Sequence, residues 1–305
     1  MEELSPSFQT SVLIVTRNHA DELRRTLNSL IPVAAGEDAA VEVLVVDLAS
    51  TDGSAQLDNE FPFAKFLRSP RHFGWVRGVN LGTRTAIGEF ICLTAPGVQF
   101  APETLGALVG HLEADPQALA VAPLVVDAQG TPVTRVYPLP DREMLSNFWR
   151  TGGLGRPEAF DLSAPTVTAP YLVNSPLVLR RRSLAGMNYV DERYGQFWAD
   201  ADICFEVRRA GKSIVLLPGV KVAGLPVHKP IPDNLDRWGA ILSADAALGA
   251  AAYIGKHEGF LAGLGFKLGT LARSFGGVFS FSSFGPHITR FLSILSGQKI
   301  DGTQG

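Results

Sequence analysis

The chain has 305 residues, of which 46% are hydrophobic and 19% are charged, so it can bury a sizeable core in one large domain, alone or with an appendage. Its formal net charge of -3 excludes a general attraction to nucleic acid. Cys92 and Cys204 lie far apart in apolar or amphipathic segments, which argues against a disulfide framework and favours a reducing compartment. The short acidic start is not typical of a secretory signal, and no apolar run reaches the roughly 18 residues of a transmembrane helix.

Short runs of β-branched and aliphatic residues alternate with segments that carry apolar residues at helical spacing. The pattern predicts strands over residues 11–15, 41–46, 63–67, 90–93 and 118–126, and helices over residues 20–30, 75–86 and 102–113. This alternation indicates an α/β fold with a mostly parallel sheet covered on both faces. Ligands of such sheets lie beyond the carboxyl ends of the strands. Thr16, Asp47 and the 94–98 turn follow strand ends, so we expect them at one edge of the sheet.

The second half of the chain is less regular. Residues 129–170 are rich in loops, and the glycine-rich stretch 150–157 is a candidate mobile lid. Beyond it the sequence predicts strands over residues 171–179, 213–217 and 220–223, and a helix over residues 200–210. After residue 232 the composition becomes apolar, glycine-rich and helical. We therefore expect one domain over residues 9–230 and a C-terminal amphipathic helical segment over residues 231–305, with a disordered tail from residue 298.

Several motifs occur in a consistent order along the chain. They are Val12–Asn18, Asp47–Ser54, Gly74–Gly82, Val190–Tyr194, Ala199–Cys204, Arg208–Gly211 and Tyr253–Gly259. Together they resemble the family-two glycosyltransferases of GT-A fold, most closely the bacterial rhamnosyltransferase-like branch, over roughly residues 9 to 260. The resemblance implies a Rossmann-like, mostly parallel sheet flanked by helices, followed by the C-terminal helical extension. It also implies inverting transfer of a sugar, for example rhamnose, from a UDP- or dTDP-linked donor to a lipid-linked glycan or a polysaccharide.

The resemblance assigns donor binding to polar residues near the strand ends. Asp47 would contact the base or ribose, since a carboxylate accepts hydrogen bonds from ring N–H groups and sugar hydroxyls. An Asx-type turn is the alternative use of Asp at that place. Thr16 and Arg17 would hold the nucleotide, with Arg17 stacked on the base or paired with phosphate, unless it is a surface residue. Arg77 and Asn80 share one face of a helix, which lies either under the nucleotide or in solvent.

The acceptor side is assigned to the helix that starts near residue 200. Inverting transfer needs a base that takes the proton of the attacking hydroxyl, and the resemblance gives that role to Asp200. The alternative role of Asp200 is to cap the helix. Members of the family carry a Glu immediately before the base, and Ala199 occupies that position here. Asp202 and His228 are expected on the diphosphate and acceptor side, and the alternative for a lone His such as His228 is a structural role.

The segment Thr94–Phe100 contains no acidic residue. Most members of the family carry an Asp there that holds Mg or Mn against the diphosphate, and here Gly97 stands at the position that faces the diphosphate. The absence argues against such a metal and leaves two alternatives. In the first, cationic side chains replace the metal, from the set Arg17, Arg77, His228, Lys229 and Arg180–Arg182. In the second, the domain is catalytically inactive and acts as a binding or scaffold partner in polysaccharide biosynthesis.

Residues 256–299 contain five Lys or Arg residues against one Glu, and their Leu and Phe residues fall mostly at helical spacing. A basic amphipathic helix is typical of contact with an anionic membrane surface. The alternative is a helix packed on the catalytic domain, in a homodimer or against a partner transferase. Membrane contact predicts a cytoplasmic protein that is peripheral on the inner face of the cell membrane, where a lipid-linked acceptor would be found.

Overall fold

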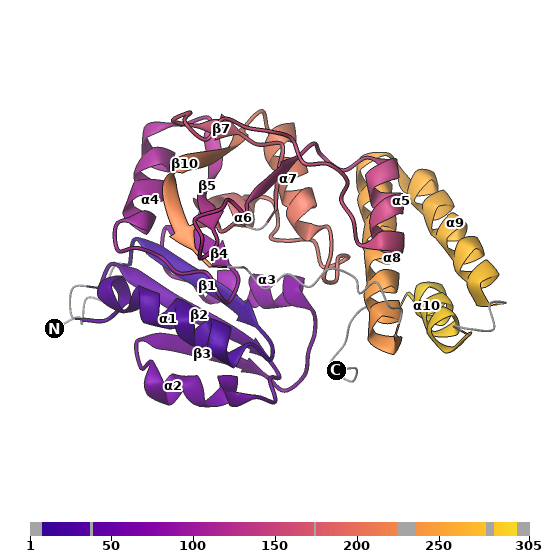
Figure 1. Cartoon of the computed structure of the whole chain (residues 1–305), viewed down its shortest axis with the longest axis horizontal. Coiled ribbons are helices and arrows are strands. Elements are labelled where there is room, and N and C mark those ends of the chain that lie inside the picture. The colour runs from indigo at the N-terminus through magenta and orange to yellow at the C-terminus, as the bar shows by residue number, and fades with distance from the viewer. Residues whose placement is uncertain (1–7, 37–38, 174, 225–235, 279–283, 298–305) are drawn as a thin grey trace.

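The computed structural model describes residues 8–36, 39–173, 175–224, 236–278 and 284–297. The chain forms a part built around a β-sheet and, beside it, a bundle of helices that contains the C-terminal helices (Figure 1). His228, Lys229 and the expected disordered tail at 298–305 lie outside the described residues.

Eight strands form one mixed sheet in the order β3-β2-β1-β4-β9-β5-β10-β7. The strands are β1 (Thr10–Thr16), β2 (Val41–Leu48), β3 (Ala64–Ser69), β4 (Phe90–Thr94), β5 (Ala118–Val126), β7 (Val167–Thr168), β9 (Leu177–Arg180) and β10 (Ser213–Ala223). The first four pair in parallel, and β9 runs antiparallel between β4 and β5. Every residue of β1, β2 and β4 is buried, as expected for central strands covered on both faces.

Helices cover both faces of the sheet. One face packs against α1 (Ala20–Ala34), α2 (Leu57–Glu60) and α4 (Thr104–Ala114), and the short 3-10 helix η1 (Gly53–Gln56) leads into α2. The other face packs against α3 (Trp75–Thr85), α6 (Arg181–Gly186) and α7 (Ala199–Arg209). Leu23, Leu27 and Leu30 are fully buried and repeat every three to four residues, which gives α1 one apolar face.

The strands and helices predicted for residues 11–126 are confirmed, although their ends differ by a few residues. Residues 129–170, predicted to be loop-rich, also contain β6 (Arg135–Tyr137), α5 (Arg142–Thr151) and β7. Asp141 caps α5 by accepting a hydrogen bond from the Met144 N–H at 2.8 Å, and Gly152 ends it with a φ of 70°. The candidate lid at 150–157 therefore begins inside the last turn of a capped helix.

Two predicted strand regions divide differently. Residues 171–179 form β8 (Tyr171–Val173), which pairs with β6 in a separate two-stranded sheet, and most of β9 in the main sheet. The strands predicted at 213–217 and 220–223 are one strand, β10, with a register shift between Leu217 and Lys221. The helix predicted at 200–210 is confirmed as α7.

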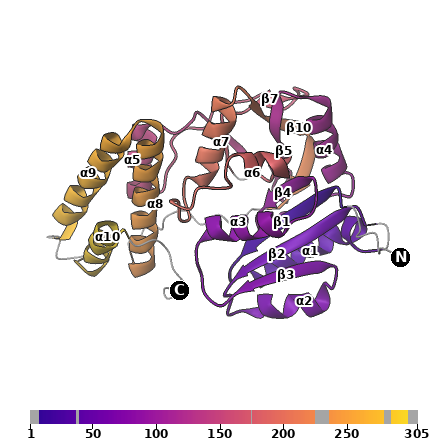
Figure 2. The same ribbon diagram turned by 180° about the vertical axis from the view of Figure 1, so that it is seen from behind.

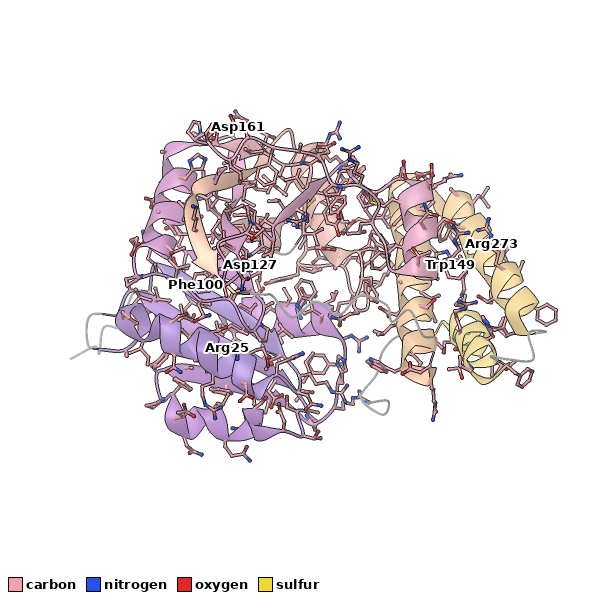
Figure 3. All side chains as sticks on the ribbon, viewed as in Figure 1. Arg25, Phe100, Asp127, Trp149, Asp161 and Arg273 are labelled. Atoms are coloured by element: carbon pink, nitrogen blue, oxygen red, sulfur yellow. The ribbon has the colours of Figure 1, made fainter. Side chains whose placement is uncertain are left out.

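The C-terminal segment is helical, as predicted, but forms three helices. They are α8 (Arg237–His257), α9 (Phe260–Val278) and α10 (Phe284–Ser296), which pack on one another, while α8 also packs on α5 (Figure 2). Trp149 of α5 lies in this bundle with the Arg290 guanidinium over its ring, and its carbonyl accepts a hydrogen bond from Ser243 Oγ at 2.6 Å (Figure 3). The apolar core runs continuously from the sheet into α8, across the expected boundary at residue 230. Among the described residues, no helix combines the length and apolar content needed to span a bilayer.

Candidate active site

Two side chains predicted to bind the donor meet at the carboxyl ends of adjacent strands. Thr16 of β1 and Asp47 of β2 are register partners in the parallel pair, and both side chains are buried. Asp47 Oδ1 accepts a hydrogen bond from the Ser50 N–H at 3.0 Å, which makes an Asx-type turn. Thr16 Oγ1 is buried and has no hydrogen-bond partner among the described residues. A buried hydroxyl without a hydrogen-bond partner destabilises the folded state, so the corner formed by Thr16 and Asp47 is suited to a polar ligand.

The loops that follow β1 and β2 are tied to each other by side chains. Asn18 Oδ1 accepts a hydrogen bond from the Thr51 N–H at 2.7 Å, and Ser50 Oγ accepts one from the Asn18 N–H at 3.0 Å. Asp52 caps η1 and also accepts a hydrogen bond from the first residue of α1. Arg17 lies in the same loop, and its buried Nε has no partner in the part of the chain that the structure describes. Local side-chain bonds therefore shape this edge of the site.

The turn at Gly97 is packed on two sides. Gly97 has a φ of 95°, and its N–H is directed to Thr26 Oγ1 at 2.9 Å and to the Glu22 carbonyl at 3.2 Å. A Cβ added to Gly224, at the end of β10, would overlap the Gly97 carbonyl oxygen. The segment 94–100 contributes no carboxylate, so this turn does not fit a hard divalent cation. The chemistry proposed below therefore passes through no metal.

Arg77 and Asn80 both contact the segment that leads from the sheet to α7. Asn80 is buried, its Nδ2 donates to the Val190 carbonyl at 2.8 Å, and its Oδ1 accepts from the Val190 N–H at 3.0 Å. Arg77 Nε lies 3.3 Å from Glu192 Oε2. Asn80 therefore joins α3 to residues 190–192, and the role of either residue toward a nucleotide stays a prediction.

Asp200 lies in the first turn of α7 and is partly exposed. Its Oδ2 accepts a hydrogen bond from the Tyr171 hydroxyl at 3.0 Å, and its Oδ1 accepts one from the Ala201 N–H at 2.9 Å. Burial raises the pKa of Tyr171 well above its ordinary value, and the negative charge of Asp200 raises it further. The phenol therefore stays a neutral donor to the carboxylate. Sequence reasoning missed Tyr171 because only the fold brings β8 against α7.

Asp202 is buried and bonded to the last turn of α8. It accepts hydrogen bonds from Lys256 Nζ at 2.7 Å and from the Tyr194 hydroxyl at 3.2 Å, and its Oδ1 lies 2.8 Å from His257 Nε2. Burial works to lower the pKa of Lys256, but the hydrogen bond and charge of Asp202 outweigh it, so this pKa is raised. Burial lowers the pKa of His257. Asp202 thus forms a junction between α7 and α8, and its expected role toward diphosphate or acceptor stays a prediction.

Asp202, Glu206 and His257 also bring three potential metal-ligand atoms within 4.8 Å of one another. The Lys256 ammonium group lies 2.7 Å from Asp202 and 3.1 Å from Glu206. The chain therefore supplies its own cation between the two carboxylates. The cluster fits an ion-pair network that holds two helices together better than it fits a metal centre.

Parts of this sequence match a family model and two relatives of known activity. Residues 11–162 match the family model described as glycosyl transferase family 2. The chain is 26% identical to the N-acetylglucosaminyl-diphospho-decaprenol L-rhamnosyltransferase of Mycobacterium tuberculosis, in strains H37Rv and CDC 1551. That match spans 238 residues, which is 71% of this chain and 76% of the relative.

Solved structures of glycosyltransferases share the fold. Mannosyltransferase PcManGT from Pyrobaculum calidifontis, in complex with GDP-Man and Mn2+, matches with a TM-score of 0.53 and 17% identity, over 97% of this chain and 91% of that chain. S. aureus TarS 1-349 matches with a TM-score of 0.51 and 15% identity, over 95% of this chain and 81% of that chain. GalNAc-T7 with UDP, GalNAc and Mn2+ matches with a TM-score of 0.55 and 15% identity, over 72% of this chain and 44% of that longer chain. At these identities the likeness shows the fold alone. Residues 11–162 therefore form a glycosyl transferase family 2 domain, and the chain has the GT-A fold.

Proposed function

We propose that the chain is a metal-independent inverting glycosyltransferase, which moves a sugar from a UDP- or dTDP-linked donor to a lipid-linked glycan or a polysaccharide. The observation that carries the proposal is the partly exposed Asp200 carboxylate, held in the first turn of α7 by the neutral Tyr171 hydroxyl. The M. tuberculosis relative supports rhamnose as the first donor sugar to test and a diphospholipid-linked glycan as the first acceptor.

In the proposed reaction Asp200 acts as the general base. The acceptor hydroxyl oxygen forms a bond to the anomeric carbon of the donor while the bond from that carbon to the diphosphate oxygen breaks. The proton of the hydroxyl passes to the Asp200 carboxylate, and the nucleoside diphosphate leaves with the bonding electron pair. Tyr171 orients the base: its hydroxyl occupies one lone pair of Oδ2 and the Ala201 N–H occupies one lone pair of Oδ1, which leaves the second lone pair of each oxygen for the acceptor hydroxyl.

The corner formed by Thr16 and Asp47 is the proposed nucleotide site. Asp47 uses Oδ1 for the turn at Ser50, which leaves Oδ2 to accept from a ring N–H or a ribose hydroxyl. Thr16 contributes a buried hydroxyl that lacks a partner within the described ranges, so bound nucleotide would satisfy it. Both groups sit on rigid, fully buried strands, which favours a preformed pocket.

The departing diphosphate gains negative charge, and the proposed mechanism needs a cation near it. Arg180 pairs in register with Phe90 at the amino end of β4, so the Arg180–Arg182 run lies at the sheet edge opposite Gly97 and does not fit this role. Arg77 is already engaged in an ion pair. Among the candidates in the described part of the chain, Arg17 lies in the loop after β1 and has an unpaired Nε. We assign charge stabilisation to Arg17.

Membrane contact through residues 256–299 is the second part of the proposal. Large apolar side chains that are at least 40% exposed lie along α9 and α10, namely Phe260, Leu261, Leu264, Leu268, Phe275, Phe284, Leu292 and Leu295. Two of the cations counted in the sequence are not available to lipid headgroups, because Lys256 is paired with Asp202 and Arg290 is buried over Trp149. Exposed Arg273, which Figure 3 labels, and partly exposed Lys267 remain among the described residues, and Lys299 lies outside them. Apolar insertion more than charge would then hold the protein at a cytoplasmic membrane face.

Titration with nucleotides decides between a transferase and an inactive scaffold. We expect UDP or dTDP to bind with a Kd in the micromolar to millimolar range, equally well with and without EDTA. GDP and a nucleoside without phosphates serve as matched ligands for base and diphosphate selectivity. Absence of binding by every nucleotide would leave the scaffold as the function of this domain.

A further inference from the structure

The start of α7 is hydrogen-bonded to α8. Asp245 Oδ2 accepts a hydrogen bond from the Gln196 N–H at 2.7 Å, and the Ala246 carbonyl accepts one from Trp198 Nε1 at 3.0 Å. The two acceptors are consecutive residues of α8, and the two donors lie just before α7 begins at Ala199. Asp245 is 1% exposed, so its bond is made away from water.

The two segments approach each other closely at Gly195. A Cβ on Gly195 would overlap the Asp245 carboxylate. The ring of Phe148 of α5 also packs edge-on against two aromatic rings of this segment, with centroid distances of 4.8 Å to Trp198 and 5.3 Å to Phe197. Residues 195–198 therefore contact both α5 and α8.

No local cap fixes the start of α7. Trp198 occupies the N-cap position with a φ of 73° and makes no side-chain capping hydrogen bond within the described structure. A bulky residue with this φ is strained and persists only where its surroundings hold it. Here the surroundings are α8 and α5, so tertiary contacts replace a cap two residues ahead of Asp200.

A second set of contacts ties the following turn of α7 to the last turn of α8. Lys256 and His257 are bonded to Asp202, and the His257 ring packs on Phe205 with the ring centroids 3.7 Å apart. Asp200 lies in the sequence between Trp198 and Asp202. The proposed base is therefore flanked on both sides by residues that α8 holds.

We propose that Asp245 and Trp198 are positioning residues for sugar transfer, and that α8 belongs to the catalytic unit. Their contacts set the direction of the first turn of α7 and, with it, the direction of the Asp200 carboxylate toward the acceptor hydroxyl. The inference rests on the proposed function for the role of Asp200. The restraint on residues 195–200 itself can be measured without turnover.

Three variants of the 305-residue chain and one control test the proposal. Asp245→Ala removes the acceptor of the Gln196 N–H, whereas Asp245→Asn keeps an acceptor oxygen of the same reach. Trp198→Phe removes the indole N–H and keeps an aromatic ring. Ser243→Ala is the control, because it removes a buried bond between α8 and α5 without touching residues 195–200. Amide hydrogen exchange of residues 195–204, nucleotide Kd, kcat and KM are measured for each.

We expect Asp245→Ala and Trp198→Phe to speed exchange over residues 195–204. Their kcat should fall by about 10- to 100-fold, the loss expected when a reacting group is displaced by about 1 Å. Nucleotide Kd and donor KM should stay within about twofold of the parent values. Asp245→Asn should recover most of kcat. Ser243→Ala should lower Tm but leave kcat and the exchange of residues 195–204 unchanged.

Unchanged exchange over residues 195–204 in Asp245→Ala overturns the proposal, as does an equal loss of kcat in Ser243→Ala. If Asp245→Ala does not fold, Trp198→Phe decides by the same two readouts. A parent chain that binds no nucleotide and transfers no sugar contradicts the proposed function instead. The exchange comparison would then still show whether α8 restrains the start of α7.

Discussion

The hydroxyl group of Tyr171 donates a hydrogen bond of 3.0 Å to the carboxylate of Asp200, across the contact between β8 and α7. Because burial keeps the phenol protonated, the bond always runs from tyrosine to carboxylate. Such a bond fixes the orientation of the carboxylate. The small β6–β8 sheet thereby helps to orient the proposed base.

Asp200→Asn should abolish transfer and leave nucleotide binding intact, because the amide cannot accept the proton while the donor corner at Thr16 and Asp47 is untouched. Steady-state transfer assays and calorimetric titration with UDP or dTDP measure the two properties. Asp161→Asn is the control, because Asp161 is an exposed loop residue whose carboxylate accepts hydrogen bonds from the Ser163 N–H and hydroxyl (labelled in Figure 3). Parental turnover in Asp200→Asn would rule out the base assignment.

Tyr171→Phe keeps the ring and removes only the donor to Asp200. We expect kcat to fall by roughly 10-fold, which corresponds to about 1.4 kcal/mol and lies close to the contribution of a hydrogen bond to a charged group. Tyr137→Phe is a matched control, since its ring lies beside that of Tyr171 in the same small sheet, tilted by 44° and with the centroids 6.3 Å apart. Equal kcat values for the two variants would contradict a role for the Tyr171 hydroxyl.

Asp47→Asn should weaken nucleotide binding by roughly 10-fold, in line with the loss of about 1.5 kcal/mol from a hydrogen bond to a charged acceptor. The asparagine oxygen can still accept from the Ser50 N–H, so the turn is retained. Asp21→Asn, at a side chain that is 81% exposed on α1, provides the comparison. Isothermal titration measures both, and a Kd equal to that of the parent would place the nucleotide elsewhere.

Leu268→Glu combined with Phe275→Glu should reduce flotation with vesicles that contain anionic lipid, because both side chains are at least half exposed on α9 and would insert into the interface. Leu162→Glu, at a similarly exposed apolar side chain in the 129–170 region, should float like the parent. Raising the salt concentration should weaken flotation only modestly, since few free cations take part. Equal flotation of all three proteins would exclude membrane contact through α9.

Thermal stability should fall as the pH is lowered from about 7 to about 5. Burial lowers the pKa of His257 below its ordinary value of 6.5, so in this window the unfolded chain binds more protons than the folded chain. Burial and the charge of Arg290 lower the pKa of His287 as well, which acts in the same direction. His257→Gln should therefore reduce, without removing, the dependence of Tm on pH. An unaltered pH dependence would show that His257 contributes nothing to it.

The parallel half of the fold could be predicted because its strands are buried along their whole length. In β1, β2 and β4 an apolar run is therefore itself the signal. α5 was missed among Pro and Gly residues, although its Asp141 cap and the apolar residues Leu145, Phe148 and Trp149 mark a short amphipathic helix. Local periodicity could not show that β8 and β9 part into different sheets, since that depends on partners far away in the sequence.

The candidate site could likewise be predicted only in part. Thr16 and Asp47 could be placed at one sheet edge, because parallel strands bring their carboxyl ends together. The contacts of Asp202 could not be foreseen, since Lys256 and His257 come from a helix 54 and 55 residues further along the chain. The contact of Asp245 could not be foreseen either. In the sequence it is a polar residue of an alanine-rich helix, and its hydrogen bond to the Gln196 N–H forms only when α8 packs beside α7.

Gly97 makes the absence of an ion ligand difficult to reverse. An aspartate introduced there would have to adopt a φ of 95°, where residues with a side chain are strained, and would have to keep the bonds to α1 and the close passage of Gly224. Engineering a cation-dependent version of this protein would therefore require a rebuilt loop with a different backbone path. The single substitution of Gly97 by aspartate would not create a cation site.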